Sequence, residues 1–109
     1  MSEARLLHQI LRAFGARPDV RLFRNNVGVA RYPDGSCVAY GLCPGSADLI
    51  GWQIIEIDGR RIARFIAIEV KGSHGRVRLN QRVFLDRVAE AGGVAVLARN
   101  LDDVREALG

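Results

Sequence analysis

The sequence has few cysteines and no apolar run of membrane length. Its 109 residues include only Cys37 and Cys43, which five residues separate. This spacing forms no CxxC pair, and His8 and His74 are not spaced to complete a zinc site, so we expect free, semi-buried thiols in a reducing cytosol. Residues 1–15 have the pattern of a helix rather than of a signal peptide. These absences predict an intracellular, cytoplasmic protein that contacts no membrane.

Repeats, low-complexity tracts and internal linkers are also absent. The length therefore predicts a single domain over residues 1–109, which can bury about two-thirds of its unfolded surface. Apolar residues make up 49% of the chain. That fraction is enough for the domain to fold without disulfides or a structural metal.

Lysine is almost absent among the positively charged residues. Sixteen Lys and Arg against twelve Asp and Glu give a net charge of +4, and fifteen of the sixteen cations are arginine. The planar fork of arginine suits phosphates and guanine edges. Ordinary solubility charge explains the composition equally well, so basicity permits a nucleic-acid partner without requiring one.

Apolar periodicity and turn residues predict an α/β domain of order α-β-β-β-β-β-α-β-α, with a mixed sheet flanked by helices. Ser2 and Gly15 bound the first helix, and Asn80 is the expected N-cap of the second, with Leu79 and Phe84 as a hydrophobic staple. The strand Val94–Ala98 is fully apolar, which favours a central parallel position. The expected elements are a helix over Glu3–Phe14, strands over Val20–Asn25, Val27–Tyr32, Cys37–Tyr40, Leu49–Ile57 and Ile62–Val70, a helix over 80–91 with a buried stripe of Phe84, Leu85, Val88 and Ala91, the strand Val94–Ala98, and a helix over Asn100–Leu108.

The dipeptide Asp58-Gly59, flanked by apolar strands, is a strong hairpin signal. If these residues form the turn, Ile57 pairs with Arg60, and stepping outward brings Asp48 opposite Glu69. Directly opposed side chains lie roughly 5 Å apart at Cβ, where like charges destabilise a sheet. A divalent cation bound by both carboxylates would explain their placement.

Strand alternation puts Lys71 on the same face as Glu69, about 7 Å further along. The two carboxylates and the Val70 backbone carbonyl are hard oxygen ligands, which Mg²⁺ or Mn²⁺ prefers. With a lysine to stabilise charge on phosphorus, this set predicts phosphodiester hydrolysis. The alternatives are a solvated strand end for Lys71 and an arginine-paired sheet edge for the two acids.

Glu3 and Gln81 both fall on the inner face of the first turn of a predicted helix. Glu3 can bind the metal, and Gln81 can hold the lysine or a substrate phosphate. Two simpler explanations have nearly equal weight. Glu3 is also a favourable charge at the helix N-terminus, and Gln81 can bond local backbone.

These residues resemble the PD-(D/E)xK nuclease superfamily, and the wider pattern is similar to its virus-type replication-repair nuclease (VRR-NUC) domain. The likeness covers nearly the whole chain, and its motifs are specific in combination although the ExK element alone is weak. One departure is Ala47, where the superfamily often has proline. The matching segments are Arg24-Asn25-Asn26-Val27-Gly28, Gly45-Ser46-Ala47-Asp48-Leu49-Ile50-Gly51, Ile68-Glu69-Val70-Lys71, Gln81 and Gly92-Gly93-Val94-Ala95.

The resemblance implies a restriction-endonuclease-like core and dependence on Mg²⁺ or Mn²⁺. It implies that Asp48 and Glu69 are ligands, that Lys71 is the catalytic cation, and that Glu3 and Gln81 are the family's acidic residue and glutamine. Stand-alone bacterial and phage members of this kind resemble Holliday-junction resolvases that act as homodimers on branched DNA. Two symmetric cuts need two active sites, which a C₂ dimer supplies.

The leading hypothesis is therefore a structure-selective DNA endonuclease. The alternatives are a catalytically silent nucleic-acid-binding module, a restriction-type or single-strand nuclease, and a subunit that needs another protein. A solvated surface position is an equal alternative for each basic residue. The residues expected near the DNA are Arg24, Asn25, Asn26, Arg76, Arg78 and Arg82.

Overall fold

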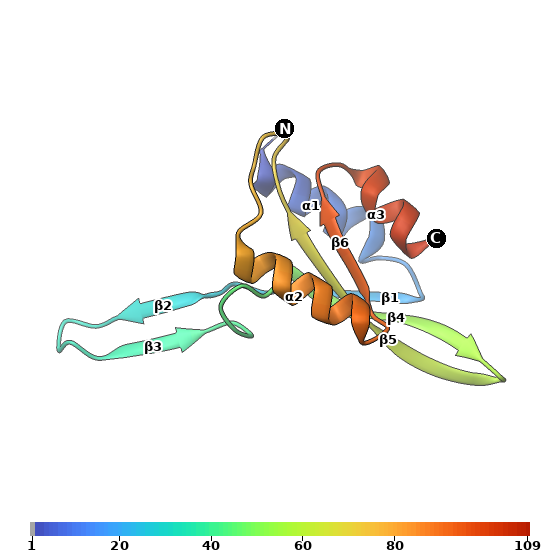
Figure 1. Cartoon of the computed structure of the whole chain (residues 1–109), viewed down its shortest axis with the longest axis horizontal. Helices are drawn as coiled ribbons and strands as arrows, with labels where there is room; N and C mark the ends of the chain where they lie inside the picture. Colours follow the sequence, from blue (N-terminus) through green and yellow to red (C-terminus); the bar gives the residue numbers. More distant parts are fainter. Residues whose placement is uncertain (1) are drawn as a thin grey trace.

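The computed structural model describes residues 2–109 and has the expected order of helices and strands (Figure 1). Strand β5 begins at Arg60, two residues earlier than expected. The elements are α1 (Glu3–Phe14), β1 (Val20–Arg24), β2 (Gly28–Arg31), β3 (Cys37–Tyr40), β4 (Leu49–Ile57), β5 (Arg60–Val70), α2 (Leu79–Glu90), β6 (Val94–Ala98) and α3 (Leu101–Leu108).

The strands form two sheets. Four of them run in the order β1-β4-β5-β6, with β6 parallel to β5 and the other neighbours antiparallel. The expectation of a central position for β6 was wrong, because β6 is an edge strand. Its apolar run has another cause: both α2 and α3 pack on it. Strands β2 and β3 pair only as a separate two-stranded sheet.

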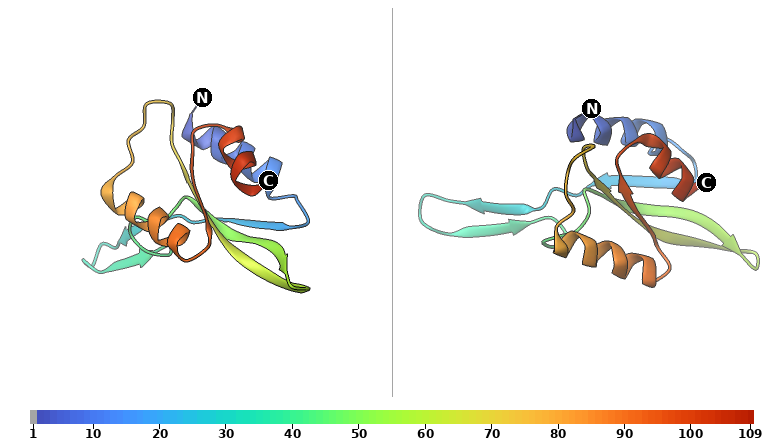
Figure 2. Two further views of the ribbon diagram at one scale, coloured as in Figure 1. Left: turned by 45° about the vertical axis from the view of Figure 1, so that its right-hand side comes forward. Right: turned by 45° about the horizontal axis from the view of Figure 1, so that its top comes forward.

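Helices cover both faces of the main sheet, with α1 and α3 on one side and α2 on the other (Figure 2). The larger core lies beneath α1 and α3, and a smaller one lies beneath α2, where Ala67 of β5 meets Leu85 and Val88. Side chains at the centre of the larger core include Ile10, Leu49, Ile66, Ile68 and Val104, which are fully buried.

The long β4–β5 hairpin has the register that its turn predicts. Asp58 and Gly59 both have positive φ, at 51° and 76°, as a type I′ turn requires. Ile57 pairs with Arg60, and the pairing continues outward to the last printed pair, Leu49 with Ile68. The next residues along the two chains, Asp48 and Glu69, are therefore opposite each other.

One predicted helix cap is confirmed and one is wrong. The Ser2 side chain accepts a hydrogen bond from the Arg5 backbone, as expected. Helix α3 begins at Leu101, one residue later than expected, with Asn100 as its N-cap. Helix α2 begins one residue before Asn80, and its N-cap is Arg78. The cap works from inside the helix, because the Gln81 side-chain oxygen accepts from the Arg78 backbone N–H at 3.0 Å.

The expected packing of α2 also needs correction at its two ends. Leu79 is 80% exposed, so it forms no buried staple with Phe84. Ala91 is exposed as well, while Leu85 and Val88 are buried as expected. The buried stripe of α2 is thus shorter than its sequence pattern.

Cys37 and Cys43 are free thiols, but both are exposed rather than semi-buried. Cys37 lies on β3, in a hairpin that projects from the body of the domain (Figure 1). Cys43 lies in the loop after β3, where its backbone bonds to Ser46. Within residues 2–109, no helix is long and apolar enough to cross a membrane.

Candidate active site

Asp48 and Glu69 meet at the end of the sheet that lies farthest from the hairpin turn. Asp48 immediately precedes β4, and its Oδ2 accepts a hydrogen bond from the Val70 backbone N–H at 2.7 Å. Glu69 lies in β5 and is only 3% exposed. The register thus holds two carboxyl groups side by side where little water reaches Glu69.

This environment raises the pKa of Glu69 to about 7. Burial is the main cause, because it disfavours the charged form, and the negative charge of Asp48 adds to it. A hydrogen bond between the two carboxyl groups further favours protonated Glu69, while Lys71 and Arg78 act in the opposite direction. Lys71 and Arg78 therefore do not fully offset the cost of ionising Glu69 in this buried position.

Lys71 lies directly beyond the end of β5. Its Nζ is 3.7 Å from Glu69 Oε1, and its side chain is 13% exposed. Its backbone N–H donates to the carbonyl of Ala98, at the end of the parallel strand β6, with an N–O distance of 3.0 Å. Pairing with β6 thus fixes the backbone of Lys71, and its side chain reaches from there to the carboxylate of Glu69.

Gln81 connects the start of α2 to the acidic pair. Its Oε1 accepts from the Arg78 backbone, and its Nε2 donates to Glu69 Oε1 at 3.1 Å in a buried contact. The bond to local backbone was one of the roles considered from the sequence. The contact within the site is made to Glu69, whereas the sequence analysis considered the lysine or a substrate phosphate. Gln81 thereby orients Glu69.

Two charged side chains hold the peptide that follows the lysine. Glu3 Oε1 accepts from the Gly72 backbone N–H at 3.2 Å, and Arg99 donates to the Gly72 carbonyl at 2.6 Å. Arg99 was not anticipated from the sequence. Its place follows from the parallel register, in which the pairing of Val70 with Ala98 puts the next residues, Lys71 and Arg99, beside each other. The sequence indicates the two strands but not this register.

One cleft of about 340 Å³ includes all five proposed catalytic residues. The structure therefore brings together side chains from α1, β5 and α2 with Asp48, over a sequence span of 79 positions from Glu3 to Gln81, both ends included. The cleft is lined by Glu3, Ala4, Leu7, Arg24, Asp48, Glu69, Val70, Lys71, Arg78 and Gln81.

The residues expected near DNA divide into three groups. Arg24 and Arg78 line this cleft. Asn25 and Asn26 line an adjoining one that also reaches Asp48 and Glu69. Arg76 and Arg82 are exposed and line neither cleft.

The amide of Asn25 is occupied within the protein. Its Nδ2 donates to Ser46 Oγ and to the Ala47 carbonyl, each at 2.8 Å, and its Oδ1 accepts from the Leu42 backbone. Ser46, 7% exposed, also donates to the Cys43 carbonyl. Asn25 and Ser46 thus fix the loop that delivers Asp48.

Because Asp48 accepts a hydrogen bond from the Val70 backbone, two substitutions of Asp48 should differ in their effect on stability. Asp48→Asn keeps an acceptor and removes a negative charge, so its metal-free melting temperature should equal or exceed that of the parent. Asp48→Ala leaves the buried Val70 N–H unpaired and should cost about 1–3 kcal/mol. Thermal melts in EDTA check the order, and a large loss in Asp48→Asn would contradict the opposed-pair geometry.

The donor set fits a hard divalent cation. Two carboxylates are held together in a buried setting that favours their neutralisation, and a cation supplies the same compensation as the proton. No group of three or more His, Cys, Asp and Glu side chains with metal-binding geometry occurs among residues 2–109. Mg²⁺ and Mn²⁺ are commonly bound by one or two carboxylates, with water and substrate phosphate completing the shell, so two carboxylates are sufficient.

Comparison with known proteins identifies the family. The VRR-NUC domain model matches residues 35–100, which include Asp48, Glu69, Lys71 and Gln81. Glu3 and Arg24 lie outside the matched span. The chain has no match among curated proteins or among solved structures. VRR-NUC domains are nuclease domains, which bind DNA, and the match covers more than half of the sequence. The chain therefore belongs to the VRR-NUC domain family.

Proposed function

We propose that this protein is a metal-dependent endonuclease that hydrolyses DNA phosphodiester bonds. The observation that carries the proposal is the cluster of Asp48, Glu69 and Lys71, with Gln81 bonded to Glu69, in one cleft. Family membership supports the nuclease class, and the carboxylate pair supports the dependence on Mg²⁺ or Mn²⁺.

Each residue has a role that follows from its position. Asp48 and Glu69 would hold the cation, together with the Val70 carbonyl, and the cation would supply Lewis-acid activation of water and phosphate. Lys71 orients the attacking water or stabilises negative charge that develops on the phosphate oxygens. Gln81 keeps the Glu69 carboxylate in place, and Glu3 fixes the Gly72 peptide beside the lysine.

Arg24 and Arg78 are positioned to bind the DNA backbone. Both are exposed and line the cleft that contains the carboxylates. Guanidinium groups form paired hydrogen bonds with phosphate oxygens. Phosphates held here would place a scissile bond near Lys71, so these arginines act in binding and orientation.

Branched DNA, cut by a homodimer, is the substrate we favour. The resemblance to small resolvases supports it, and a chain with one pair of metal-binding carboxylates needs a second copy to make two symmetric cuts. The nuclease activity does not depend on this finer proposal.

The test is a cleavage assay with Mg²⁺, Mn²⁺ or EDTA on four-way junction, flap, linear duplex and single-stranded DNA. We expect cutting that requires the metal and is strongest on the junction. Asp48→Asn should bind DNA and cut none of the substrates, because it keeps the hydrogen bond to Val70 but loses a metal ligand.

Other outcomes correct different parts of the proposal. Equal cutting of all substrates would keep the nuclease and reject selectivity for branched DNA. Binding without cutting under every metal condition would favour a catalytically silent module or a missing partner protein. Cutting of single strands alone would favour the single-strand nuclease.

A further inference from the structure

A second cleft adjoins the one that contains the proposed catalytic residues, and Lys71 does not line it. It encloses about 370 Å³, a volume typical of small-ligand sites. The two clefts meet at four residues that line both, namely Asp48, Glu69, Arg78 and Gln81. A group that fills the second cleft, called here the side pocket, therefore lies next to whatever the two carboxylates bind.

Two loops and the start of α2 form the other walls of the side pocket, with residues 25–27, residues 44–46 and Asn80. The second loop packs tightly on the helix. Gly45 has a φ of +83°, and a Cβ atom at this position would come within 2.9 Å of Asn80. The Asn25 amide holds the same loop with two hydrogen bonds of 2.8 Å. The pocket is therefore already formed without a ligand.

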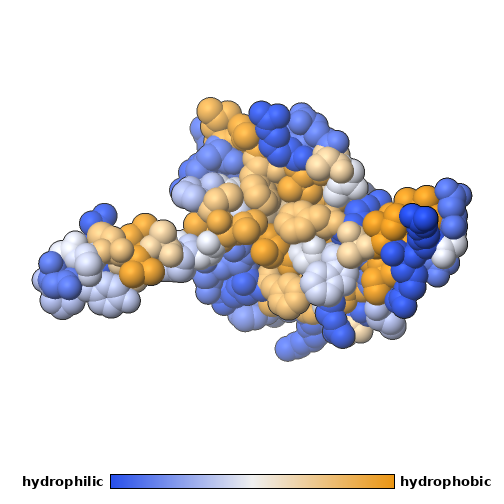
Figure 3. All heavy atoms as spheres, turned by 90° about the horizontal axis from the view of Figure 1, so that it is seen from below, coloured by the Kyte–Doolittle hydropathy of each residue, from blue (hydrophilic) through white to orange (hydrophobic). Residues whose placement is uncertain are grey.

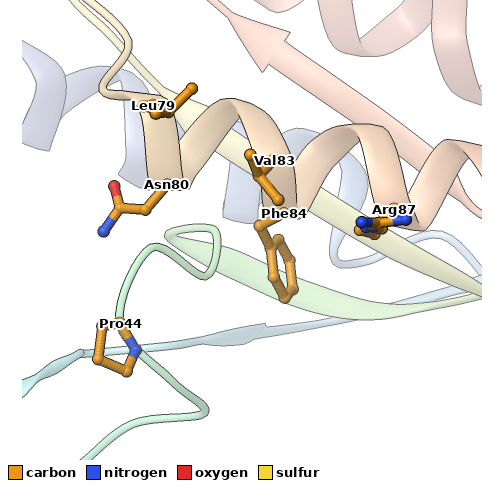
Figure 4. Close-up of a pocket in the computed structure, with 6 residues that line it drawn as sticks. All are labelled: Pro44, Leu79, Asn80, Val83, Phe84 and Arg87. Atoms are coloured by element: carbon orange, nitrogen blue, oxygen red, sulfur yellow. The ribbon is translucent and has the colours of Figure 1, made fainter.

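The side pocket offers two amide side chains to a ligand. Asn26 and Asn80 are both exposed, in contrast to Asn25, whose amide is bonded within the protein. Figure 4 shows the Asn80 side chain leaving the first turn of α2 on the side of the loop that carries Pro44. An amide presents donors and an acceptor in one plane, which matches the hydrogen-bonding edge of a nucleobase.

Two apolar side chains add surface on which a flat ring can lie. Val27 is 38% exposed, and Pro44 is exposed at the opposite loop. Both line the side pocket together with the two amides. Enzymes that bind an unpaired base commonly combine hydrogen bonds to its edge with apolar contacts to its faces. The side pocket has both kinds of group.

The charges of the side pocket disfavour a phosphate as its occupant. Arg78 is the only cation among the described residues that line it, and it is opposed by Asp48 and Glu69. Arg24 and Lys71 line only the catalytic cleft. A phosphate is therefore better placed in the catalytic cleft, whereas the side pocket suits a neutral group that forms hydrogen bonds.

The surface beyond the side pocket is largely apolar. Pro44 and Asn80 also line a groove along α2 where Leu79 and Val83 are 80% and 45% exposed and Arg87 is the only charged residue. Figure 3, the view from below, shows apolar residues over the middle of the body. Because this surface has little charge to attract phosphates, the DNA backbone should follow the catalytic cleft, from which a base can reach into the side pocket.

We propose that the side pocket binds one unpaired nucleobase of the DNA, from the nucleotide next to the scissile phosphate. This inference rests on the proposed function, because it places that phosphate at the carboxylate pair. Asn26 and Asn80 bond to the edge of the base, and Val27 and Pro44 contact its faces. A base that is paired and stacked in a duplex cannot make these contacts unless it is first extruded.

The occupant of the side pocket sets the class of substrate. Extruding a base costs least where it is already unpaired, as at a flap or a branch point. The protein should therefore cut beside unpaired nucleotides. One chain contains the whole side pocket, so this selection arises within each copy and does not require two copies to act together.

The first test detects the base without cutting. 2-Aminopurine, an adenine analogue whose fluorescence rises when it leaves the base stack, is placed in turn at each position around the branch point of a flap substrate. With saturating protein in EDTA, we expect the fluorescence to rise about twofold or more at one position and to stay nearly constant two nucleotides away. Asn26→Ala and Asn80→Ala should reduce the rise. Arg82→Gln, exposed on α2 outside both clefts, is the control that should keep it.

The second test removes the base instead of the amide. An abasic nucleotide at the responsive position keeps the sugar and the phosphate. In single-turnover cleavage with Mg²⁺, Asn80→Ala should cut the normal flap about tenfold more slowly than the parent protein. On the abasic flap the two proteins should cut at the same rate, because the lost contact no longer exists. Arg82→Gln should change the rate by the same factor on both flaps, and so would a loss of folding.

Three results would overturn the proposal. They are a fluorescence rise at no position, an equal rise at all positions, and an equal loss of rate in Asn80→Ala on the normal and abasic flaps. Fluorescence in EDTA does not depend on catalysis. A rise at one position in a protein that cuts nothing would therefore reject the nuclease and keep the base site, and metal-dependent cutting that is indifferent to the base would do the reverse.

Discussion

Replacing Lys71 with methionine should lower the rate of DNA cleavage by about two to three orders of magnitude, the size typical when one charge-stabilising group is removed. Lys71 contributes the only lysine ammonium in the chain, and it lies 3.7 Å from the Glu69 carboxylate. Methionine preserves the length and packing of the stem while removing the charge. Single-turnover cleavage at saturating enzyme would isolate the chemical step from DNA binding.

Stability should change little in the same variant. Lys71 follows the last residue of β5, and its backbone bond to Ala98 does not depend on its side chain. The matched control is Arg12→Met, which removes one positive charge from an exposed position on α1 outside the cleft. Equal loss of cutting in both variants would point to weaker DNA attraction, and unchanged turnover in Lys71→Met would remove the lysine from the mechanism.

The second large effect is a dependence of metal-free stability on pH, caused by Glu69. Its pKa is about 7 in the folded protein and near 4.5 in the unfolded chain. Below about pH 4.5 both states carry the proton, and the free energy of unfolding is unaffected. As pH rises from about 4.5 to about 7 only the unfolded state releases its proton, so stability falls, by about 3 kcal/mol in total.

Urea unfolding in EDTA at about pH 5 and about pH 8 measures this loss. Glu69→Gln cannot ionise, so it should lack this part of the pH dependence and be the more stable protein at the higher pH. Mg²⁺ or Mn²⁺ should restore stability to the parent chain at high pH and have little effect on Glu69→Gln. Identical pH slopes in the two proteins would show that Glu69 is ionised without penalty.

The central part of the site was predictable because one local signal fixes a long-range distance. The Asp58-Gly59 turn sets the register, and strict alternation then carries that register along β4 and β5 to Asp48 and Glu69. The same alternation places Lys71 correctly. Helix periodicity likewise placed Gln81 on the buried side of α2.

The errors occur where the outcome depended on tertiary packing. Asn80 has the right chemistry for an N-cap, but Gln81 caps the helix from within while it bonds to Glu69, and no local pattern reveals that double role. An apolar strand such as β6 can lie at the centre of a sheet, or at its edge with helices packed on both faces. Both positions bury the strand and require the same apolar residues, so the sequence does not distinguish them.

The exposure of Cys37 and Cys43 is an error of the same kind. Alternation predicts which strand residues share a face, but it does not say whether anything covers that face. The β2–β3 hairpin extends beyond the body, so Cys37 is open to solvent, and Cys43 is exposed in the loop that follows β3. Placement of the hairpin relative to the body required the structure.

The two hydrogen bonds of the Gln81 side chain, to the Arg78 backbone and to Glu69, have a consequence for how activity responds to temperature. The first turn of a helix opens at lower free-energy cost than the strands of a core, so it is among the first parts of a domain to be lost on warming. Here that turn includes the amide that orients Glu69, whereas Asp48 and Glu69 themselves are held by the sheet. Catalytic competence should therefore decline while the sheet is still intact, and the working range of the enzyme would be set by the start of α2 rather than by the melting of the domain.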